Sequence, residues 1–346
     1  MQFIEYNWIP YTDDIMLRNP AIKYEQINSI YPTGLTTGVN GFEFTFVPTL
    51  LMSELHSIIL DRYNKIKIEN HKVEECNEIY YTTKIEGCHI TYARTVEIHD
   101  GKPIDKNDYF NEMMIKSGFE AIKYMNVCGN RLSDEILINM WNILVEGCCQ
   151  NQEVRGERYR VGPIYVGGSL GLDACFLEEA MSNWIDFYNS SILDDYPFIK
   201  AALLHVSYEI IHPFCDGNGR SGRLLMINYL IDRCFDKCKA ISFSKKITER
   251  LDGYYKNLAL SRNIESDCTP FIEYMLYVFK DVFEDILYGV DSANIVVRVD
   301  RVRHSYYIKI GGIRYNIKDM DLSIDDFGTN YVMIGNKRYN LIFTNN

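Results

Sequence analysis

Hydrophobic residues recur every three or four positions along most of the chain, which is the repeat of a helix with one apolar face. A first stripe begins after Pro48 and consists of Leu50, Leu51, Leu55, Ile58, Ile59 and Tyr63. A second runs from about His71 to Ile85 and stops at Gly87, a residue type common just past a helix end. The same spacing continues over residues 107–124, 133–146, 175–191, 195–211, 217–234, 246–262 and 269–288. The pattern therefore predicts a mainly α-helical bundle.

Two stretches break the helical pattern. Residues 156–169, GERYRVGPIYVGGS, place β-branched and aromatic residues between Gly and Pro, which predicts a short β-hairpin flap. Residues 1–47 mix Pro, Gly, Asn and aromatic residues with weak periodicity. We expect them to form an extended arm with one short hairpin near Phe42–Phe46.

After about Tyr288 the pattern changes to alternation of apolar and polar residues, which is typical of strands. Residues 307–317 (YIKIGGIRYNI) resemble residues 331–341 (YVMIGNKRYNL). Gly311-Gly312 and Gly335-Asn336 suit two-residue hairpin turns, because both pairs tolerate positive φ. We expect residues 291–346 to form a small module of two β-hairpins that packs on the helical body or on a partner.

Composition and charge exclude several classes of protein. Of the 346 residues, 47% are hydrophobic and 24% are charged, as in globular proteins. The net charge of −11 argues against a nucleic-acid partner, which needs a basic face. No apolar stretch reaches the roughly 18 residues of a membrane span. The N-terminus lacks the apolar run of a secretory signal, and the ten cysteines contain no C-x-x-C pair, so we expect reduced thiols and a cytoplasmic protein.

The densest group of reactive residues is the segment from His212 to Arg223, HPFCDGNGRSGR, between two predicted helices. Gly217 and Gly219 flank Asn218 where a helix begins, so backbone N–H groups and the helix dipole would cradle an anion. Arg220 and Arg223 are three positions apart and could both face that anion.

Two further residues of this segment suit phosphate chemistry. Asp216 has a hard oxygen suited to Mg²⁺, which proteins hold with one or two carboxylates plus substrate phosphates. His212 can accept a proton near neutral pH. Together with the cradle, these residues predict a site for a metal-bound polyphosphate beside a hydroxyl nucleophile.

The segment also matches the dinucleotide fingerprint G-x-G-x-x-G, at Gly217 to Gly222. That fingerprint requires a buried strand before it and alternating strands and helices around it. Helical patterns lie on both sides here, so we reject this interpretation. His205 lies seven residues before His212 in an apolar helix, where we expect an ordinary core histidine rather than a metal ligand.

His212 to Arg223 resembles the signature of the Fic family, H-x-F-x-[D/E]-G-N-G-R-x-x-R, at every defined position. The resemblance spans roughly residues 48–285. It includes the flap, where Gly156-Glu-Arg-Tyr-Arg160 and Ile164-Tyr165-Val166 are similar to the family's hairpin. The resemblance implies a Fic-fold helical bundle with a short hairpin flap, and a nucleotidyltransferase that moves AMP from ATP onto a Ser, Thr or Tyr hydroxyl of a target protein, with release of pyrophosphate.

The resemblance also implies roles for individual residues. His212 would be the general base, and Asp216 would hold Mg²⁺ or Mn²⁺. The α- and β-phosphates would bind Gly217, Asn218 and Gly219, with Arg220 and Arg223 neutralising the outer phosphates. Phe214 would anchor the loop in the core. In the flap, Ile164, Tyr165 and Val166 would hold the target by strand pairing and cover the nucleotide, and Tyr254 and Tyr255 lie where relatives contact adenine.

A second motif, Thr82-Thr-Lys-Ile-Glu86-Gly87, is similar to the inhibitory-helix pattern [S/T]-x-x-x-E-[G/N] of many Fic proteins, in the class with the inhibitor N-terminal to the core. By that resemblance Glu86 would pair with Arg223 and block a productive ATP pose. Thr82 would bond near Asn218 and brace the helix. The expected domains are 1–95 for the arm and inhibitory helix, 96–290 for the catalytic core, and 291–346 for the β-rich module.

The favoured prediction is an autoinhibited adenylyltransferase that uses ATP with magnesium and can form a homodimer. A second hypothesis in the same fold is removal of AMP from a modified target, with Glu86 positioning water. A third, from another class, is a catalytically quiet regulatory module that binds partners through its C-terminal hairpins. The intact His212 and Asp216 argue against the third.

Overall fold

The computed structural model describes the chain except for residues 3–30, 37–42, 68–70, 130, 150–157, 264–266, 289–294, 301–304, 311–312, 320–321, 325–329, 335–336 and 344–346. The described residues fall into two compact units, residues 1–58 with 68–279, and residues 59–67 with 280–346. Most elements are helices, which confirms the mainly α-helical prediction.

The helices are α2 (Leu50–Lys65), α3 (His71–Ile85), α4 (Tyr92–His99), α5 (Tyr109–Met125), α6 (Asp134–Leu144), α7 (Leu177–Asn189), α8 (Pro197–Ile211), α9 (Asn218–Asp232), α10 (Phe243–Glu249), α11 (Leu251–Asn263) and α12 (Thr269–Tyr288).

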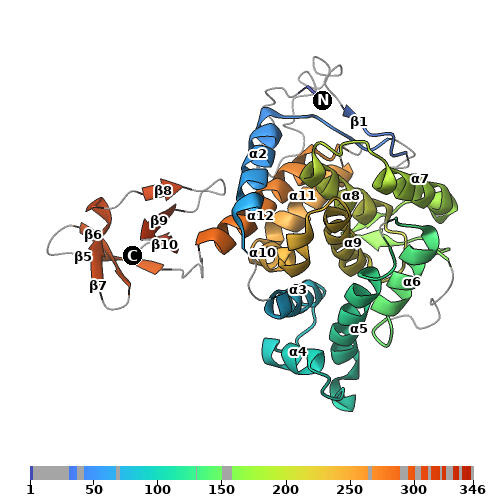
Figure 1. Cartoon of the computed structure of the whole chain (residues 1–346), viewed down its shortest axis with the longest axis horizontal. Coiled ribbons are helices and arrows are strands. Elements are labelled where there is room, and N and C mark those ends of the chain that lie inside the picture. The colour runs from blue at the N-terminus through green and yellow to red at the C-terminus, as the bar shows by residue number, and fades with distance from the viewer. Residues whose placement is uncertain are drawn as a thin grey trace. The chain divides into compact units, whose positions relative to one another are not determined.

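Helices α8 and α9 form the centre of the first unit, and the other helices surround them (Figure 1). Every residue of α8 is buried, which explains why its sequence, PFIKAALLHVSYEII, is apolar on all sides. Gly222 of α9 allows close packing, because a Cβ there would lie 2.7 Å from Oε1 of Glu209 and 3.0 Å from Nδ1 of His205 on α8. The close α8–α9 pair carries the His212–Arg223 segment at its connection.

One predicted helix extent was wrong, and one helix was not predicted. The expected single helix over 246–262 is two helices, α10 and α11, which break at Arg250, where φ is −133°. The Tyr274 hydroxyl donates a hydrogen bond to the Arg250 carbonyl oxygen at this break. Helix α4 was not predicted, because it is short and buries only Thr95 and Ile98.

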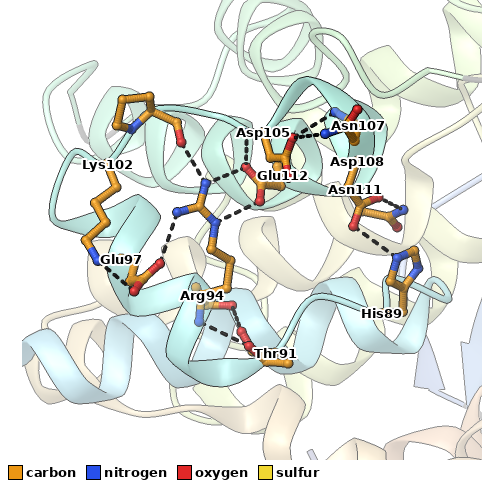
Figure 2. A network of polar contacts seen from close by, with 12 residues as sticks. His89, Thr91, Arg94, Glu97, Lys102, Asp105, Asn107, Asp108, Asn111 and Glu112 are labelled. Carbon is orange, nitrogen blue, oxygen red and sulfur yellow. Dashed lines mark hydrogen bonds and ion pairs between the residues drawn. The ribbon is translucent and has the colours of Figure 1, made fainter.

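Helix α4 follows the end of α3 and docks on α5 through an ion-pair network (Figure 2). The Arg94 guanidinium donates from Nε and Nη2 to the two oxygens of Glu112, at 2.7 Å each. Glu112 also accepts a hydrogen bond from the Asp105 backbone N–H at 2.6 Å. The Arg94–Glu97 ion pair and a contact of 3.0 Å between Nε2 of His89 and Oδ2 of Asp108 flank this bidentate pair. The network fixes the segment that immediately follows Glu86.

Short strands accompany the helical unit. Strands β1 (Tyr31–Pro32) and β2 (Thr45–Phe46) pair antiparallel, so the expected hairpin strand near Phe46 exists but its partner lies at Tyr31–Pro32. The flap is the antiparallel pair β3 (Tyr165–Val166) and β4 (Ser169–Leu170), near the end of the predicted 156–169 segment. Gly156 and Glu157 of that segment, and most of the predicted N-terminal arm, lie outside the described residues.

The second unit contains one sheet with the strand order β7-β6-β5-β10-β9-β8. Its strands are β5 (Ile295–Asp300), β6 (Ser305–Ile310), β7 (Ile313–Asn316), β8 (Leu322–Ile324), β9 (Asn330–Ile334) and β10 (Lys337–Phe343). The two predicted hairpins, β6–β7 and β9–β10, are present. The sequence analysis missed β5 and β8, and a parallel pairing of β5 with β10 joins the two hairpins into one sheet.

Candidate active site

The loop between α8 and α9 holds the chemical motif in a fixed conformation. His212 caps α8 in the left-handed region, at φ 53° and ψ 63°, and its backbone N–H still donates to the Tyr208 carbonyl oxygen at 2.8 Å. This conformation is uncommon for a residue other than glycine and ends the helix abruptly. Phe214 then turns into the core, where its ring stacks on Trp141 with centroids 4.1 Å apart. The expected anchoring role of Phe214 therefore matches its position.

Asn218 closes the loop with its own side chain. Its Nδ2 donates to the Phe214 carbonyl oxygen at 2.7 Å, and its Oδ1 accepts from the Phe214 N–H at 3.0 Å. The Trp141 indole N–H donates to the Asp216 carbonyl oxygen at 2.8 Å. Gly217 adopts φ 77°, and a Cβ there would lie 2.8 Å from Val145, so this position requires glycine. These contacts hold the loop in one backbone conformation.

Arg160 joins this loop to the flap segment. It is buried, and its guanidinium donates to the carbonyl oxygens of His212, Gly162 and Leu172 at 2.8, 2.7 and 2.5 Å. Its backbone N–H donates to the Pro213 carbonyl oxygen at 2.9 Å. One arginine therefore fixes the position of the flap segment relative to the imidazole.

The His212 side chain is placed to accept a proton at Nε2. Its Nδ1 lies 3.3 Å from the Glu209 carbonyl oxygen, which can only accept, so Nδ1 carries the hydrogen in the neutral ring. Burial lowers the pKa of His212 to about 4. The ring is consequently neutral at physiological pH, with Nε2 available as the acceptor.

Arg223 is held by the end of α3. Its Nη2 donates to Oε1 of Glu86 at 2.6 Å, its Nε donates to Oγ1 of Thr82 at 2.8 Å, and its Nη2 also donates to the Thr82 carbonyl oxygen at 3.1 Å. Burial by itself would lower the pKa of Arg223, but Glu86, Tyr254 and Glu209 together favour the charged guanidinium, and the pKa is raised. The expected Glu86–Arg223 pair is present. Thr82, by contrast, bonds Arg223 rather than the expected neighbour Asn218, because the Asn218 amide is taken up by Phe214.

Gly219 makes room for this pair. A Cβ at Gly219 would lie 2.3 Å from Oε1 of Glu86 and 3.1 Å from Nη1 of Arg223. The Glu86 carboxylate therefore occupies the space against the first turn of α9. An anion is favoured there by the helix N-terminus.

A cavity of about 560 Å³ opens in front of these groups, within the usual range of ligand pockets. Six of the predicted site residues line it: Glu86, Val166, His212, Gly219, Arg223 and Tyr255. The other predicted residues, Thr82, Ile164, Tyr165, Asp216, Gly217, Asn218 and Arg220, do not line it. Tyr254 also lines the cavity, although its hydroxyl bonds Nε2 of His205 at 2.8 Å. His205 itself is a buried core residue, as expected.

The two arginines of the motif diverge instead of facing one anion. Arg220 is buried and donates from Nη1 to the Leu144 carbonyl oxygen at 3.2 Å and to Sγ of Cys148 at 3.3 Å. Residues three apart on a helix differ by about 60° in direction, and here that angle places Arg223 on the cavity and Arg220 against α6. The expectation that Arg220 and Arg223 both face one anion site was wrong, because only Arg223 lines the cavity.

Asp216 lies just before α9 with its side chain 31% exposed. Its Oδ1 accepts from the Gly217 N–H at 2.6 Å and lies 3.9 Å from Nη2 of Arg220. Across the described ranges, no three His, Cys, Asp or Glu side chains gather closely enough to hold a metal by themselves. A single exposed carboxylate still suits Mg²⁺, which takes most of its other ligands from water and phosphate.

The flap reaches the cavity through Val166 and Gly167, whereas Tyr165 is 74% exposed. Arg262 of α11 connects to the flap, because its Nη1 donates to the Val166 carbonyl oxygen at 2.5 Å. The Nε and Nη2 atoms of Arg262 are buried without a hydrogen-bond partner among the described residues. The sequence analysis missed Arg262, and no local motif marks it.

Glu209 is a second residue that the sequence analysis missed. It lies one helical turn before His212 and lines the same cavity. It is buried, and burial raises its pKa to about 7. A lone carboxylate in the otherwise apolar stretch before His212 was the signal that could have revealed it.

Comparison with known proteins gives matches over this part of the chain. Residues 132–230 match the model of the Fic/DOC family. "Protein adenylyltransferase Fic" of Drosophila melanogaster is 30% identical over 206 residues, which cover 57% of this chain and 39% of that protein. The protein of the same name in Drosophila erecta is 32% identical over 211 residues, with 57% and 39% covered. The matched region is thus about two-fifths of the length of these relatives.

Solved structures share the fold. A Fic family protein from Desulfovibrio desulfuricans has a TM-score of 0.63 at 21% identity, covering 72% of this chain and 78% of its own. Fic-1 of C. elegans (residues 134–508) has a TM-score of 0.56 at 18% identity, covering 69% and 71%. Separately, none of the described helices is long and apolar enough to cross a membrane.

Proposed function

We propose that the chain, whose residues 132–230 match the model of the Fic/DOC family, is a protein adenylyltransferase held inactive by Glu86. It would transfer AMP from ATP to a Ser, Thr or Tyr hydroxyl of a target protein and release pyrophosphate. One observation carries this proposal: His212, Gly219, Arg223 and Glu86 all line one cavity, and Glu86 lies 2.6 Å from Arg223.

The geometry assigns each residue a task in this reaction. The neutral His212 ring accepts the hydroxyl proton at Nε2, so the oxygen attacks the α-phosphorus as the bond to pyrophosphate breaks. Gly219 at the start of α9 offers backbone N–H groups to the phosphates. Arg223 neutralises charge on the outer phosphates once it is free of Glu86. Such transfer depends on positioning and charge neutralisation more than on covalent chemistry.

Glu86 would act as the inhibitor by competition. Its carboxylate accepts a hydrogen bond from the guanidinium of Arg223 and fills the space beside Gly219, where an incoming phosphate would otherwise lie. Two like charges in a partly buried site repel each other strongly. ATP can therefore adopt a productive pose only when Glu86 moves away.

Asp216 is the residue that would hold Mg²⁺, which when bound neutralises phosphate charge. Its position beside the cradle and its exposure suit a cation that also takes phosphate oxygens. Arg220, whose Nη2 lies 3.9 Å from that carboxylate, would fix the orientation of Asp216. The roles of both residues remain predictions.

The target protein would approach along the flap. The flap strand Tyr165–Val166 is two residues long and exposes Tyr165, so a target segment could add to it by strand pairing. Ile164 would take part from the flap base. Self-modification between two copies would follow the same geometry, and a homodimer is one partner that we propose.

The decisive experiment is transfer of radiolabel from α-labelled ATP with magnesium. We expect Glu86→Gly to raise labelling of the chain itself about tenfold or more over the original protein, since one lost charge-assisted hydrogen bond of about 1.5–3 kcal/mol frees Arg223. Glu135→Gly, which removes an exposed acid from α6, is the matched control and should not raise labelling. His212→Ala added to Glu86→Gly should abolish it.

Equal labelling by the Glu86→Gly variant and the original protein would end the autoinhibition proposal. Absence of label in every variant would instead favour the quiet binding module.

Removal of AMP is the second candidate, and one observation favours it. Glu86 is 33% exposed and lines the same cavity as His212, so it could orient water towards a modified target. Incubation of an AMP-modified target with the protein and magnesium should then release AMP in the original protein but not in the Glu86→Gly variant.

A further inference from the structure

Helix α3 is attached to two other helices by side-chain hydrogen bonds. At its last turn, Thr82 and the following Glu86 accept from Arg223 of α9. Eight residues before Glu86, Glu78 accepts from residues at the start of α10. Glu78, Thr82 and Glu86 are spaced four residues apart, so they follow one side of the helix. The attachment at Glu78 has no part in the reaction proposed above.

Three donors bind the Glu78 carboxylate. Its Oε1 accepts from the Ser244 hydroxyl at 2.5 Å, and its Oε2 accepts from the Ser244 backbone N–H at 3.0 Å and from the Ser242 hydroxyl at 3.1 Å. All three residues are buried. Burial raises the pKa of Glu78, whereas the hydrogen bonds from Ser244 and Ser242 favour its ionised form. Hydrogen bonds to an ionised carboxylate are stronger than those between neutral groups, so this attachment is a firm one.

The helix links the position of Glu78 to that of Glu86. Helix α3 is continuous from His71 to Ile85, and the Glu86 backbone N–H donates to the Thr83 carbonyl oxygen at 3.0 Å, which continues the last turn. Eight residues of helix span only about 12 Å. While Glu78 is bound to α10, the Glu86 carboxylate is therefore held at a high effective concentration beside Arg223. Without that attachment, the contact with Arg223 and the packing of α3 must hold the helix by themselves.

We propose that Glu78 is a positioning residue for the inhibitor: its attachment to α10 keeps Glu86 on Arg223 and so determines the strength of autoinhibition. Glu78 does not line the nucleotide cavity, so it acts through α3 and not on ATP. The effect on autoinhibition rests on the proposed function. The positioning itself does not, because the contact of α3 with Arg223 can be measured without nucleotide.

The first test uses the full chain without ATP. Glu78→Met keeps the side-chain length and has a similar helix propensity, but it removes both acceptors and leaves the buried Ser244 N–H unpaired. We expect hydrogen–deuterium exchange over residues 71–85, and exchange of the Arg223 Nε proton that Thr82 accepts, to accelerate about tenfold. Mass spectrometry follows the first and NMR the second. Glu78→Gln still offers an acceptor to the Ser244 N–H, so its acceleration should be smaller.

The second test is transfer of radiolabel from α-labelled ATP. In the chain that retains Glu86, Glu78→Met should raise self-labelling about tenfold. In the Glu86→Gly background the same change should add nothing, because no carboxylate is left to position. A merely structural role of Glu78 would instead lower labelling in both backgrounds. The control is Glu273→Met, which changes a buried acid of α12 that accepts from Thr49 at 2.6 Å, and it should leave labelling and exchange of α3 unchanged.

Ser244→Ala tests the same attachment from α10 if Glu78→Met folds poorly. It removes the 2.5 Å hydrogen bond and should accelerate exchange of the Arg223 Nε proton. Unchanged exchange at Arg223 in both variants would overturn the proposal, whatever the labelling. Labelling that rises in Glu86→Gly but in neither of these variants would overturn it as well. If Glu86→Gly does not raise labelling, the proposed function fails, and the exchange at Arg223 decides the role of Glu78 by itself.

Discussion

At the scale of single residues, burial determines the pKa of His212. An exposed histidine has a pKa near 6.5 and would lose its basic form below that pH. The pKa of His212 is lowered to about 4 because burial penalises the charged ring. The neutral, proton-accepting form of His212 therefore persists at acidic pH, down to about pH 4.

We expect the labelling rate of the Glu86→Gly variant to show no His212 inflection between pH 8 and pH 5.5. Glu209, whose pKa burial raises to about 7, lines the same cavity and could add its own inflection. Single-turnover rates should therefore be measured with and without Glu209→Gln. An inflection near pH 6.5 that persists in the Glu209→Gln background would contradict the assignment of the buried His212 as the base.

At the scale of elements, two arginines determine where the flap lies. Arg160 donates to three carbonyl oxygens, at the base of the flap and in the loop between α8 and α9. Arg262 donates to the Val166 carbonyl oxygen near the tip of the flap. The flap strands themselves are only two residues long, so strand pairing contributes little. The position of the flap tip thus depends on a contact from α11, distant in sequence.

Arg262→Met keeps most of the side-chain volume and removes the donors. We expect proteolytic cleavage within residues 163–170 to accelerate about tenfold, because loss of a charged hydrogen bond costs about 1.5–3 kcal/mol. Limited proteolysis with mass spectrometry measures the rate. Lys123→Met, an exposed change on α5, is the control. Unchanged cleavage in Arg262→Met would show that other contacts hold the flap.

The second element-scale case is the docking of α4 on α5 shown in Figure 2. The Glu112 side chain is 4% exposed and pairs with Arg94, which is 22% exposed, and this pairing lowers the pKa of Glu112. Because the guanidinium keeps some contact with water, the pair lies between the surface and buried limits.

Glu112→Gln keeps the size and removes the charge. We expect it to lower the free energy of unfolding by about 2 kcal/mol, read from urea denaturation. Glu97→Gln changes the exposed acid that also pairs with Arg94 and should cost clearly less. Equal losses of unfolding free energy in the two variants would mean that the burial of Glu112 does not strengthen its pair with Arg94.

At the scale of the whole molecule, two buried histidines, His56 and His205, and the half-buried His212 make the fold sensitive to acid. Burial lowers the pKa of His56 and His212 to about 4 and that of His205 to about 3. Between these values and about 6.5 the unfolded chain binds more protons than the folded one, so stability falls as pH decreases. Each histidine contributes up to about 1.4 kcal/mol per pH unit.

His56→Phe tests this at a position away from the active site, where the ring contacts Tyr196 and Phe198. We expect the loss of unfolding free energy between pH 6.5 and 4.5 to shrink by about 2–3 kcal/mol. Chemical denaturation at several pH values measures it, with the exposed His89→Phe as the control. An identical pH dependence in His56→Phe and the original chain would contradict the prediction.

Local sequence determined the parts of this protein that depend on near neighbours. The apolar residues located α3, α8, α9 and α12 to within a few residues, because a helix that packs on its neighbours is apolar on the faces that it buries, which in α8 means all of them. Gly311-Gly312 and Gly335-Asn336, which lie outside the described residues, predicted two hairpins, and the strands on either side of them pair as β6–β7 and β9–β10. The segment from His212 to Arg223 predicted phosphate chemistry, since glycines, a base and arginines stand there in one short stretch.

Only the tertiary structure decided which of those groups meet. It joined Glu86 to Arg223 across 137 positions, turned Arg220 away from Arg223, and brought Arg262 and Glu209 into the cavity. It also assembled two hairpins and two further strands into one sheet by a parallel pairing. The reason is that long-range contacts depend on which faces pack together, and a side chain's pKa depends on how much water that packing excludes. Neither is encoded in the spacing of residues within a single segment.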